Sequence, residues 1–345
     1  MYAYNYTNVN PAYVGNEGTN NAKLIMLNQS LLDIRAFFNT LGELNSTPKA
    51  MFTFDIIIPT YNNKDELLWC LASLEAQTFT DFRVLVCVNG ANDGTLEALA
   101  ALQTSFQVLV LEHPDKQNHG RPANRNLGIS NLEAPFTLLL DSDQAADKNL
   151  VLKHHELLSK QDCISVGEVI YQQKNDWNTY IASRGKGKFT DLAHIPFQYL
   201  NTQNVALKST YLQQVGGFDE QIQGYGGDDT ELAYRLWQKF QLPVIYNQKA
   251  FSNDDQAKSV NQALVQMYDF GANNLPYIHQ KHPEFKEIFN VALLKNKVVN
   301  TFLVNGLLYN SIKNIYPIFP STIKNTCIHY LLFYNICKGF NGVKD

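Results

Sequence analysis

Two acidic clusters in the chain have residue types and spacing that could do chemistry. In the first, Asp141 and Asp143 follow the uncharged, apolar run of residues 136–140. Residues two apart in an extended chain point to the same side, so both carboxylates could reach one divalent cation that is also bound by water and phosphate oxygens. A strand-to-loop turn is the alternative, because Asp and Ser favour turns.

The second acidic cluster, residues 224–231, reads Gly-Tyr-Gly-Gly-Asp-Asp-Thr-Glu. Its glycines would let the backbone approach a ligand closely. Asp228 and Asp229 stand where we predict that a helix over residues 230–240 begins, so one of them could simply cap that helix. Capping accounts for one carboxylate only, and the other is a candidate general base.

The elements that must position these clusters follow from an alternating pattern after residue 52. Apolar runs predict strands at 54–58, 82–88, 107–111, 136–140 and 164–170, with helices at 65–77, 95–102, 118–128 and 150–159. This order is typical of an α/β fold with a doubly wound, mostly parallel, Rossmann-like sheet. Ligands in such folds bind beyond the carboxyl ends of the strands. Here those ends carry Thr60, Asn62, Asn89, Asp93, Asp141 and Asp143.

The flanking segments differ in composition from this pattern. Residues 23–44 carry an apolar stripe that predicts an N-terminal helix. Residues 172–200 break the alternation and predict an irregular lid or binding loop, whose Lys186 and Lys188 could fold over a diphosphate. After residue 289, lysines and apolar residues fit helices that either lie on an anionic membrane surface or pack against the main domain.

These shifts divide the chain into three parts. We expect an N-terminal irregular segment and helix at 1–50, a main domain at 51–255 and a helical C-terminal extension at 256–345. Within the main domain we expect a nucleotide-binding half at 51–145 and an acceptor and catalytic half at 146–255.

Composition narrows the class of protein. The chain has 345 residues, 45% of them apolar, and a formal charge of −4, which favours a globular protein and gives no electrostatic argument for nucleic acid. Its five cysteines are odd in number and lack metal-ligand spacing, which suits a reducing compartment. Neither a secretory signal nor a membrane-spanning apolar run is visible. We expect a cytoplasmic protein, with peripheral contact at the inner face of a membrane left open.

Between residues 54 and 246 the chain resembles the inverting nucleotide-sugar glycosyltransferases of the family-two type, which have the GT-A fold. Residues 55–62 resemble the opening strand, 89–95 the turn under the nucleotide base, and 120–128 the basic helix start. Asp141-Ser142-Asp143 is similar to the family's Asp-x-Asp metal motif. Residues 216–220, followed by 224–231, resemble a galactosyltransferase-type C-terminal half.

The resemblance implies roles for residues of this chain. Asp141 and Asp143 would hold Mn²⁺ or Mg²⁺, and Asn253 would replace the family's histidine as third ligand, with Asp254 and Asp255 as open alternatives. Asp229 would be the catalytic base, with Asp228 not excluded. Tyr225 would flank the sugar and the acceptor. The nucleotide-sugar site would comprise Pro59, Thr60, Tyr61, Asn62, Asn89, Asp93, Arg121, Arg125, Asp141, Ser142, Tyr225, Gly226 and Gly227.

The expected function is metal-dependent, inverting transfer of a hexosyl or N-acetylhexosaminyl group from a nucleoside-diphosphate donor, expected to be a UDP-sugar. The acceptor would be a hydroxyl of a glycan, glycolipid or glycoprotein, in polysaccharide or glycoconjugate biosynthesis. Asn89 departs from the aspartate that often begins the base-binding turn. Two alternatives are a non-catalytic, nucleotide-sugar-binding partner subunit of another transferase and a nucleotidyltransferase.

Overall fold

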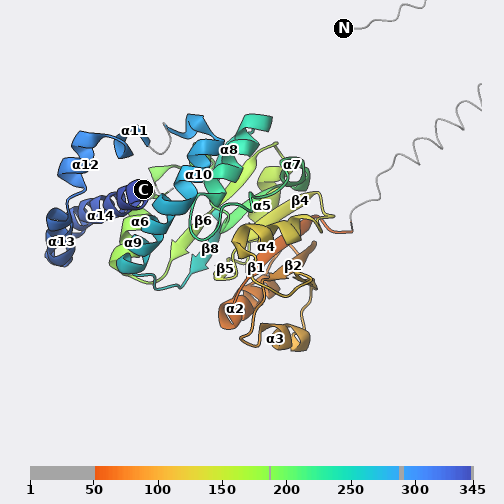
Figure 1. Cartoon of the computed structure of the whole chain (residues 1–345). Coiled ribbons are helices and arrows are strands. Elements are labelled where there is room, and N and C mark those ends of the chain that lie inside the picture. The colour runs from red at the N-terminus through yellow and green to blue at the C-terminus, as the bar shows by residue number, and fades with distance from the viewer. Residues whose placement is uncertain (1–50, 186–187, 287–290, 343–345) are drawn as a thin grey trace, which may run out of the picture. The chain divides into compact units, whose positions relative to one another are not determined.

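An eight-stranded sheet runs through the computed structural model, which describes residues 51–185, 188–286 and 291–342 (Figure 1). The strand order is β3-β2-β1-β4-β7-β6-β8-β5. The strands are β1 (Phe54–Thr60), β2 (Phe82–Val88), β3 (Gln107–Glu112), β4 (Phe136–Leu140), β5 (Gln144–Ala146), β6 (Ile164–Tyr171), β7 (Asn204–Lys208) and β8 (Val244–Asp254). The predicted N-terminal helix and Lys186 lie outside the described residues.

The first half of the sheet is parallel and the second half is mixed. β1 pairs in parallel with β2 and β4, and β2 with β3. β7 then runs antiparallel to both β4 and β6, while β8 is parallel to β6 and antiparallel to β5. The five predicted strands are confirmed, whereas β5, β7 and β8 were not predicted. β5 has only three residues, and β8 exposes Gln248 and Lys249 in its middle, so neither forms a continuous apolar run.

Helices cover both faces of the sheet, which confirms a doubly wound α/β fold. One buried apolar cluster joins β1 and β2 to α2 (Lys64–Glu75), α3 (Thr95–Ala101) and α5 (Leu150–Leu158). Another joins the opposite face to α4 (Gly120–Ile129), α7 (Ser209–Gln214) and α8 (Asp228–Phe240). α4 packs very closely, because a Cβ on Gly128 would lie 2.7 Å from Ile57 Cγ2 and 3.0 Å from Cys87 Sγ.

The predicted irregular segment at 172–200 contains a helix, α6 (Asp176–Arg184), so that prediction was wrong in part. The Asn175 side chain caps α6 by accepting from Asn178 N, and Trp177 and Tyr180 are buried against the C-terminal helices. Helix formation here depends on this distant packing, which the local sequence pattern does not reveal.

The C-terminal region is helical, as predicted, and α14 packs against α9 and α6 (Figure 1). In the described part of the chain no helix is long and apolar enough to cross a membrane. The helices of this region are α9 (Val260–Asp269), the π-helical η3 (Phe270–Asn274), α10 (Leu275–Lys281), η4 (Pro283–Lys286), α11 (Val291–Leu294), α12 (Lys297–Leu303), α13 (Gly306–Ile315), η5 (Tyr316–Ile318) and α14 (Ser321–Gly342). A short 3₁₀ turn, η2 (Phe197–Tyr199), precedes β7.

A buried ion pair lies inside the parallel half of the sheet. Asp55 on β1 and Arg83 on β2 are register partners, and Arg83 Nε lies 2.5 Å from Asp55 Oδ1. Asp55 Oδ2 also accepts from the backbone N–H groups of Glu133 and Ala134, 2.6 and 2.8 Å away. This carboxylate therefore fixes the turn that leads into β4.

We predict that Asp55→Ala destabilises the protein by about 3 to 5 kcal/mol, because it leaves the Arg83 charge buried without its partner. Urea unfolding should measure this loss. Glu133→Ala is the matched control, because Glu133 pairs with the same arginine but is 72% exposed and should contribute less than about 1 kcal/mol. Equal losses in the two variants would contradict this account.

Candidate active site

One buried arginine connects the two acidic clusters. The Arg125 side chain, on α4, is 1% exposed, and its Nη2 donates to Asp141 Oδ1 at 2.7 Å. Its Nη1 donates to Asp228 Oδ2 at 3.1 Å and lies 3.7 Å from Asp229 Oδ1. The carboxyl end of β4 and the first turn of α8 therefore meet at one guanidinium.

Several contacts hold α4, and with it Arg125, in this position. Asn124 Nδ2 donates to Cys87 O of β2 at 2.7 Å. On the other side Asn126 accepts from Phe218 N at 2.7 Å and donates to Phe218 O at 2.9 Å. The Phe218 ring lies 5.2 Å from the guanidinium carbon of Arg125. Burial alone would lower the pKa of Arg125, but the surrounding carboxylates raise it, so the group stays charged.

Asp228 and Asp229 have different surroundings. Gly227, not an aspartate, is the N-cap residue of α8, so the helix-cap interpretation of Asp228 was wrong. The Asp228 side chain is 9% exposed and faces Arg125. The Asp229 side chain is 29% exposed, and its Oδ1 accepts from Thr202 Oγ1 at 2.6 Å. Burial and the charge of Asp228 raise the pKa of Asp229, although Arg125 and Thr202 oppose the shift. Asp229 is thus the more accessible of the pair.

The Asp-x-Asp motif is joined by a third carboxylate from β8. Burial and the negative charges of Asp141 and Asp254 together raise the pKa of Asp143 to about 7. Asp254 is buried and is the register partner of Gln144, the residue after Asp143. Carboxylate oxygens are the ligands that a hard cation such as Mn²⁺ or Mg²⁺ prefers, so these three residues are the candidates to hold one. Across the described ranges, no three or more His, Cys, Asp or Glu side chains are grouped so that they could hold a metal ion together.

The three alternatives for the third ligand differ in position. Asn253 Oδ1 accepts from Gln172 Nε2 at 2.6 Å, and Asp255 Oδ1 accepts from Gln173 Nε2 at 2.6 Å. Neighbouring residues on a strand point to opposite faces, so Asn253 and Asp254 face different sides of β8. The interaction with Asp143 involves Asp254.

The predicted nucleotide-binding residues form a hydrogen-bonded rim at the ends of β1 and β2. Thr60 donates to Asn63, whose Nδ2 donates to Ser142 Oγ at 2.6 Å, which ties β1 to the Asp-x-Asp motif. Asn89 donates to Asn118 Oδ1 and accepts from His119 N, at 2.7 and 2.9 Å, and so fixes the loop before α4.

Two further rim residues hold the ends of helices. Asp93 accepts from Lys64 N at 2.9 Å and from Thr95 Oγ1 at 2.6 Å, and so fixes the starts of α2 and α3. Asn62, at φ +49°, accepts from Asn92 N at 2.9 Å. Of the other predicted rim residues, Pro59 is buried within β1, whereas Tyr61 is 49% exposed and Arg121 is exposed on α4.

The glycine-rich loop before α8 is held from the C-terminal region. Gly226 and Gly227 have φ values of +86° and +96°, which favour glycine, and the Phe270 ring would lie 3.3 and 3.2 Å from a Cβ on each. Asn274 Nδ2 donates to the carbonyl oxygens of Gln223 and Gly226 at 2.8 and 2.9 Å. Sequence reasoning missed Asn274, Phe270 and Thr202, because none belongs to a recognisable motif.

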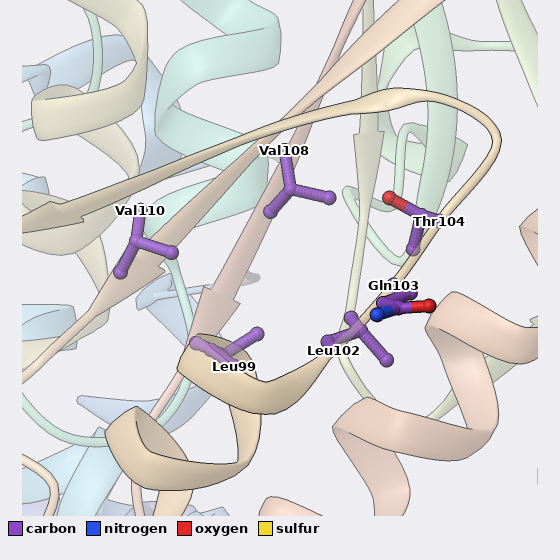
Figure 2. A pocket seen from close by; sticks show the side chains of 6 residues that line it. All are labelled: Leu99, Leu102, Gln103, Thr104, Val108 and Val110. Atoms are coloured by element: carbon purple, nitrogen blue, oxygen red, sulfur yellow. The ribbon is translucent and has the colours of Figure 1, made fainter.

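A hollow elsewhere on the protein does not belong to this site. Figure 2 shows it between α3 and β3, with a volume of about 380 Å³ and a lining of Leu99, Leu102, Gln103, Thr104, Val108 and Val110. Its lining residues carry no titratable group and include none of the residues around Arg125.

Two protein-family models match the chain. The model described as glycosyl transferase family 2 matches residues 55–215, and the model described as N-terminal domain of galactosyltransferase matches residues 191–247. Together they extend over the parallel half of the sheet, the Asp-x-Asp motif, the glycine-rich loop and α8.

Relatives with similar sequences are glycosyltransferases. The chain is 26% identical to the uncharacterized glycosyltransferase YfnE of Bacillus subtilis, over 53% of this chain and 60% of that protein. It is 25% identical to a chondroitin synthase of Escherichia coli, over 82% of this chain and 47% of that protein. It is also 28% identical to a chondroitin synthase of Pasteurella multocida, over 66% of this chain and 28% of that protein. The chain therefore spans between about a quarter and three fifths of the length of these relatives.

Solved structures share the fold at low sequence identity. The mannosyltransferase PcManGT from Pyrobaculum calidifontis, in complex with GDP-Man and Mn²⁺, has a TM-score of 0.61 at 16% identity, over 87% of this chain and 91% of that one. S. aureus TarS 1-349, in complex with UDP-GlcNAc, has a TM-score of 0.52 at 15% identity, over 85% of this chain and 90% of that one. These likenesses confirm the predicted GT-A fold. The family models and the relatives show that this chain is a glycosyltransferase enzyme, with sequence of the family-two type over residues 55–215.

Proposed function

We propose that this enzyme transfers a sugar from a UDP-sugar to an acceptor hydroxyl, with a divalent cation and with inversion at the anomeric carbon. The observation that carries the proposal is the contact of Arg125 with Asp141 on one side and with Asp228 and Asp229 on the other. Carboxylates suited to a cation and a carboxylate suited to a base therefore lie within the reach of one side chain.

Asp229 would act as the general base. Its carboxylate accepts the proton of the acceptor hydroxyl while the acceptor oxygen forms a bond to the anomeric carbon. The bond from that carbon to the diphosphate breaks, and its electron pair leaves with the nucleoside diphosphate. This single displacement inverts the anomeric centre. Thr202 orients the base through both oxygens, because its Oγ1 donates to Asp229 Oδ1 at 2.6 Å and its backbone N–H donates weakly to Oδ2 at 3.4 Å.

Asp141, Asp143 and Asp254 would hold Mn²⁺ or Mg²⁺. When bound, the cation supplies Lewis-acid neutralisation of the leaving diphosphate. We assign the third position to Asp254 because this side chain interacts with Asp143, whereas the Asn253 amide is bonded to Gln172. Arg125 Nη2 orients Asp141 by donating to its Oδ1 at 2.7 Å.

The donor nucleotide would lie along the rim of β1 and β2. Pro59, Tyr61 and Asn62 are placed at the end of β1, and Arg121 at the start of α4. Support for a UDP-sugar comes from the TarS complex with UDP-GlcNAc. The two chondroitin synthases favour a hexosyl or N-acetylhexosaminyl group and a growing glycan as acceptor. Asp229 could equally accept the proton of a hydroxyl group on a glycolipid or a glycoprotein.

We predict that Asp229→Asn lowers turnover by about 100- to 10,000-fold with little change in UDP affinity, because the amide cannot accept the acceptor proton. Manganese-stimulated release of UDP from UDP-GlcNAc, UDP-glucose, UDP-galactose and UDP-glucuronic acid, with glycan oligosaccharides as acceptors, should measure turnover. Because the pKa of Asp229 is raised, the wild-type rate should fall with decreasing pH at values above the usual aspartate pKa of about 4.

The matched control for this prediction is Asp255→Asn, which changes an exposed carboxylate that is bonded to Gln173. This variant should retain wild-type turnover. Full activity in Asp229→Asn would remove Asp229 from the role of base.

The metal assignment gives a separate prediction. Asp143→Asn and Asp254→Asn should each weaken manganese-dependent UDP binding at least about tenfold, because each removes a charged oxygen ligand. Asn253→Ala should have little effect. Calorimetry with UDP, in MnCl₂ or in EDTA, makes the comparison. Loss of binding in Asn253→Ala but not in Asp254→Asn would reverse the assignment.

We further propose that the C-terminal helices contact an anionic membrane surface. Val298, Phe302, Leu307 and Ile318 on α12, α13 and η5 are 65% to 81% exposed. Residues 291–342 contain five lysines and no aspartate or glutamate. Exposed apolar side chains among basic residues match the headgroup region of a bilayer that contains anionic lipids. We call this set of four residues the apolar C-terminal face.

Vesicle sedimentation should test this contact. We predict that the protein binds phosphatidylglycerol-containing vesicles more tightly than phosphatidylcholine vesicles and that salt weakens the binding. The double variant Leu307→Ser and Ile318→Ser should lose most binding, whereas Val110→Ser, at an exposed position on β3, should retain it. A dimer that this double variant separates, with no vesicle binding, would assign the apolar C-terminal face to a protein interface instead.

A further inference from the structure

Lys258 is a cation that the proposed chemistry has not used. It lies between the end of β8 and the start of α9, and its Nζ is 4.9 Å from the centroid of the Trp177 ring and 4.3 Å from that of the Tyr225 ring. Nζ also donates to the Tyr225 hydroxyl at 3.2 Å. Two aromatic rings therefore hold one ammonium group.

The two rings come from separate segments of the chain. Trp177 is on α6 and is 7% exposed, so its ring is fixed in the core formed with α9 and α14. Tyr225 belongs to the glycine-rich loop, three residues before Asp228. Lys258 itself follows Asp254 by four residues. The ammonium is thus placed beside both the loop that carries the proposed base and the strand that carries the proposed third metal ligand.

The surroundings of Lys258 leave its charge available. Among the residues that the structure describes, neither Lys258 nor Arg121 takes part in an ion pair. Aromatic rings attract an ammonium group without neutralising it. Lysine has three N–H donors, of which Tyr225 takes one. The side chain is therefore held by two rings and a hydroxyl rather than by an ion pair, although Asp254 acts electrostatically on its charge.

A second positively charged side chain, Arg121, interacts electrostatically with Lys258. Burial and the positive charge of Arg121 together lower the pKa of Lys258 to about 8, while Asp254 opposes the shift. Arg121 also interacts electrostatically with Tyr225. Two like charges close together are unfavourable unless an anion lies between or beside them. An anion bound to both Lys258 and Arg121 would offset the repulsion between them. The same anion could also bind a metal ion held by Asp143.

We propose that Lys258, held by Trp177 and Tyr225, binds the diphosphate of the nucleotide donor together with Arg121. This inference rests on the proposed function, since it takes a nucleoside diphosphate as the ligand of the same site. Lys258 is a binding residue here, and Trp177 is a positioning residue that acts through it.

Calorimetric titration of the full chain with UDP and with uridine, in MnCl₂, tests the inference. Lys258→Gln should weaken UDP binding roughly tenfold to a hundredfold, the range for a hydrogen bond to a charged group, and should leave uridine binding unchanged. Lys258→Arg should retain much of the UDP affinity. Trp177→Leu should weaken UDP binding roughly two- to thirtyfold, because the ammonium is less well held.

Lys249→Gln is the matched control. Lys249 is on the same strand, β8, but its side chain is 71% exposed and pairs with Asp191, so its replacement should leave both affinities unchanged. The thermal unfolding midpoint of each variant shows whether the fold survives the change.

The outcomes separate this inference from the proposed function. Wild-type UDP affinity in Lys258→Gln would overturn the role of Lys258 and leave the proposed function standing. An equal loss of UDP and uridine affinity would also overturn it, because a merely structural lysine would affect both ligands. Failure of the wild-type protein to bind any nucleoside diphosphate would overturn the proposed function itself.

Discussion

The site depends on the burial of one positive charge among three negative charges. Arg125 is 1% exposed, and its two terminal nitrogens contact carboxylates from β4 and α8. A buried charge without partners is costly, and so is a buried cluster of carboxylates without a cation. Each side of this arrangement therefore requires the other. Because α4, β4 and α8 supply the four charges, the ion cluster fixes the relative position of the elements that carry the chemistry.

The distance of each carboxylate from Arg125 distinguishes the residues proposed to hold the cation from the residue proposed as the base. Arg125 lies against Asp141 and Asp228, so its charge is largely used by them. Asp143 and Asp254 receive no such partner, and the pKa of each is raised. Asp229 is farther from the guanidinium and is bonded to a neutral hydroxyl. One arginine thus leaves one carboxylate pair suited to a cation and another carboxylate suited to accept a proton.

The parallel half of the sheet and the two acidic clusters could be predicted from sequence, because each is a continuous local pattern. Residues 54–58 and 82–88 are apolar apart from Asp55 and Arg83, and Asp141 and Asp143 directly follow the apolar run at 136–140. The sequence left Asn253, Asp254 and Asp255 open as the third ligand, and the choice of Asp254 that we propose depends on the pairing of β8 with β5, which has only three residues. Thr202, Lys258 and Asn274 were missed for a related reason: their roles arise from contacts with residues 27 to 81 positions away in the chain.

The C-terminal extension contributes to the site as well as to stability. The loop before α8 needs positive φ at Gly224, Gly226 and Gly227, and three glycines within four residues give the unfolded chain much freedom. Asn274 and Phe270 of η3 restrict this loop through its carbonyl oxygens and through ring contact. A π-helical turn is rare and often marks a functional region. Here η3 places Asn274 within hydrogen-bond distance of the loop. Because this loop leads directly into Asp228 and Asp229, the helices after β8 help to fix the positions of both aspartates. A transferase core that ended at β8 would keep both aspartates but lose the contacts that hold their loop.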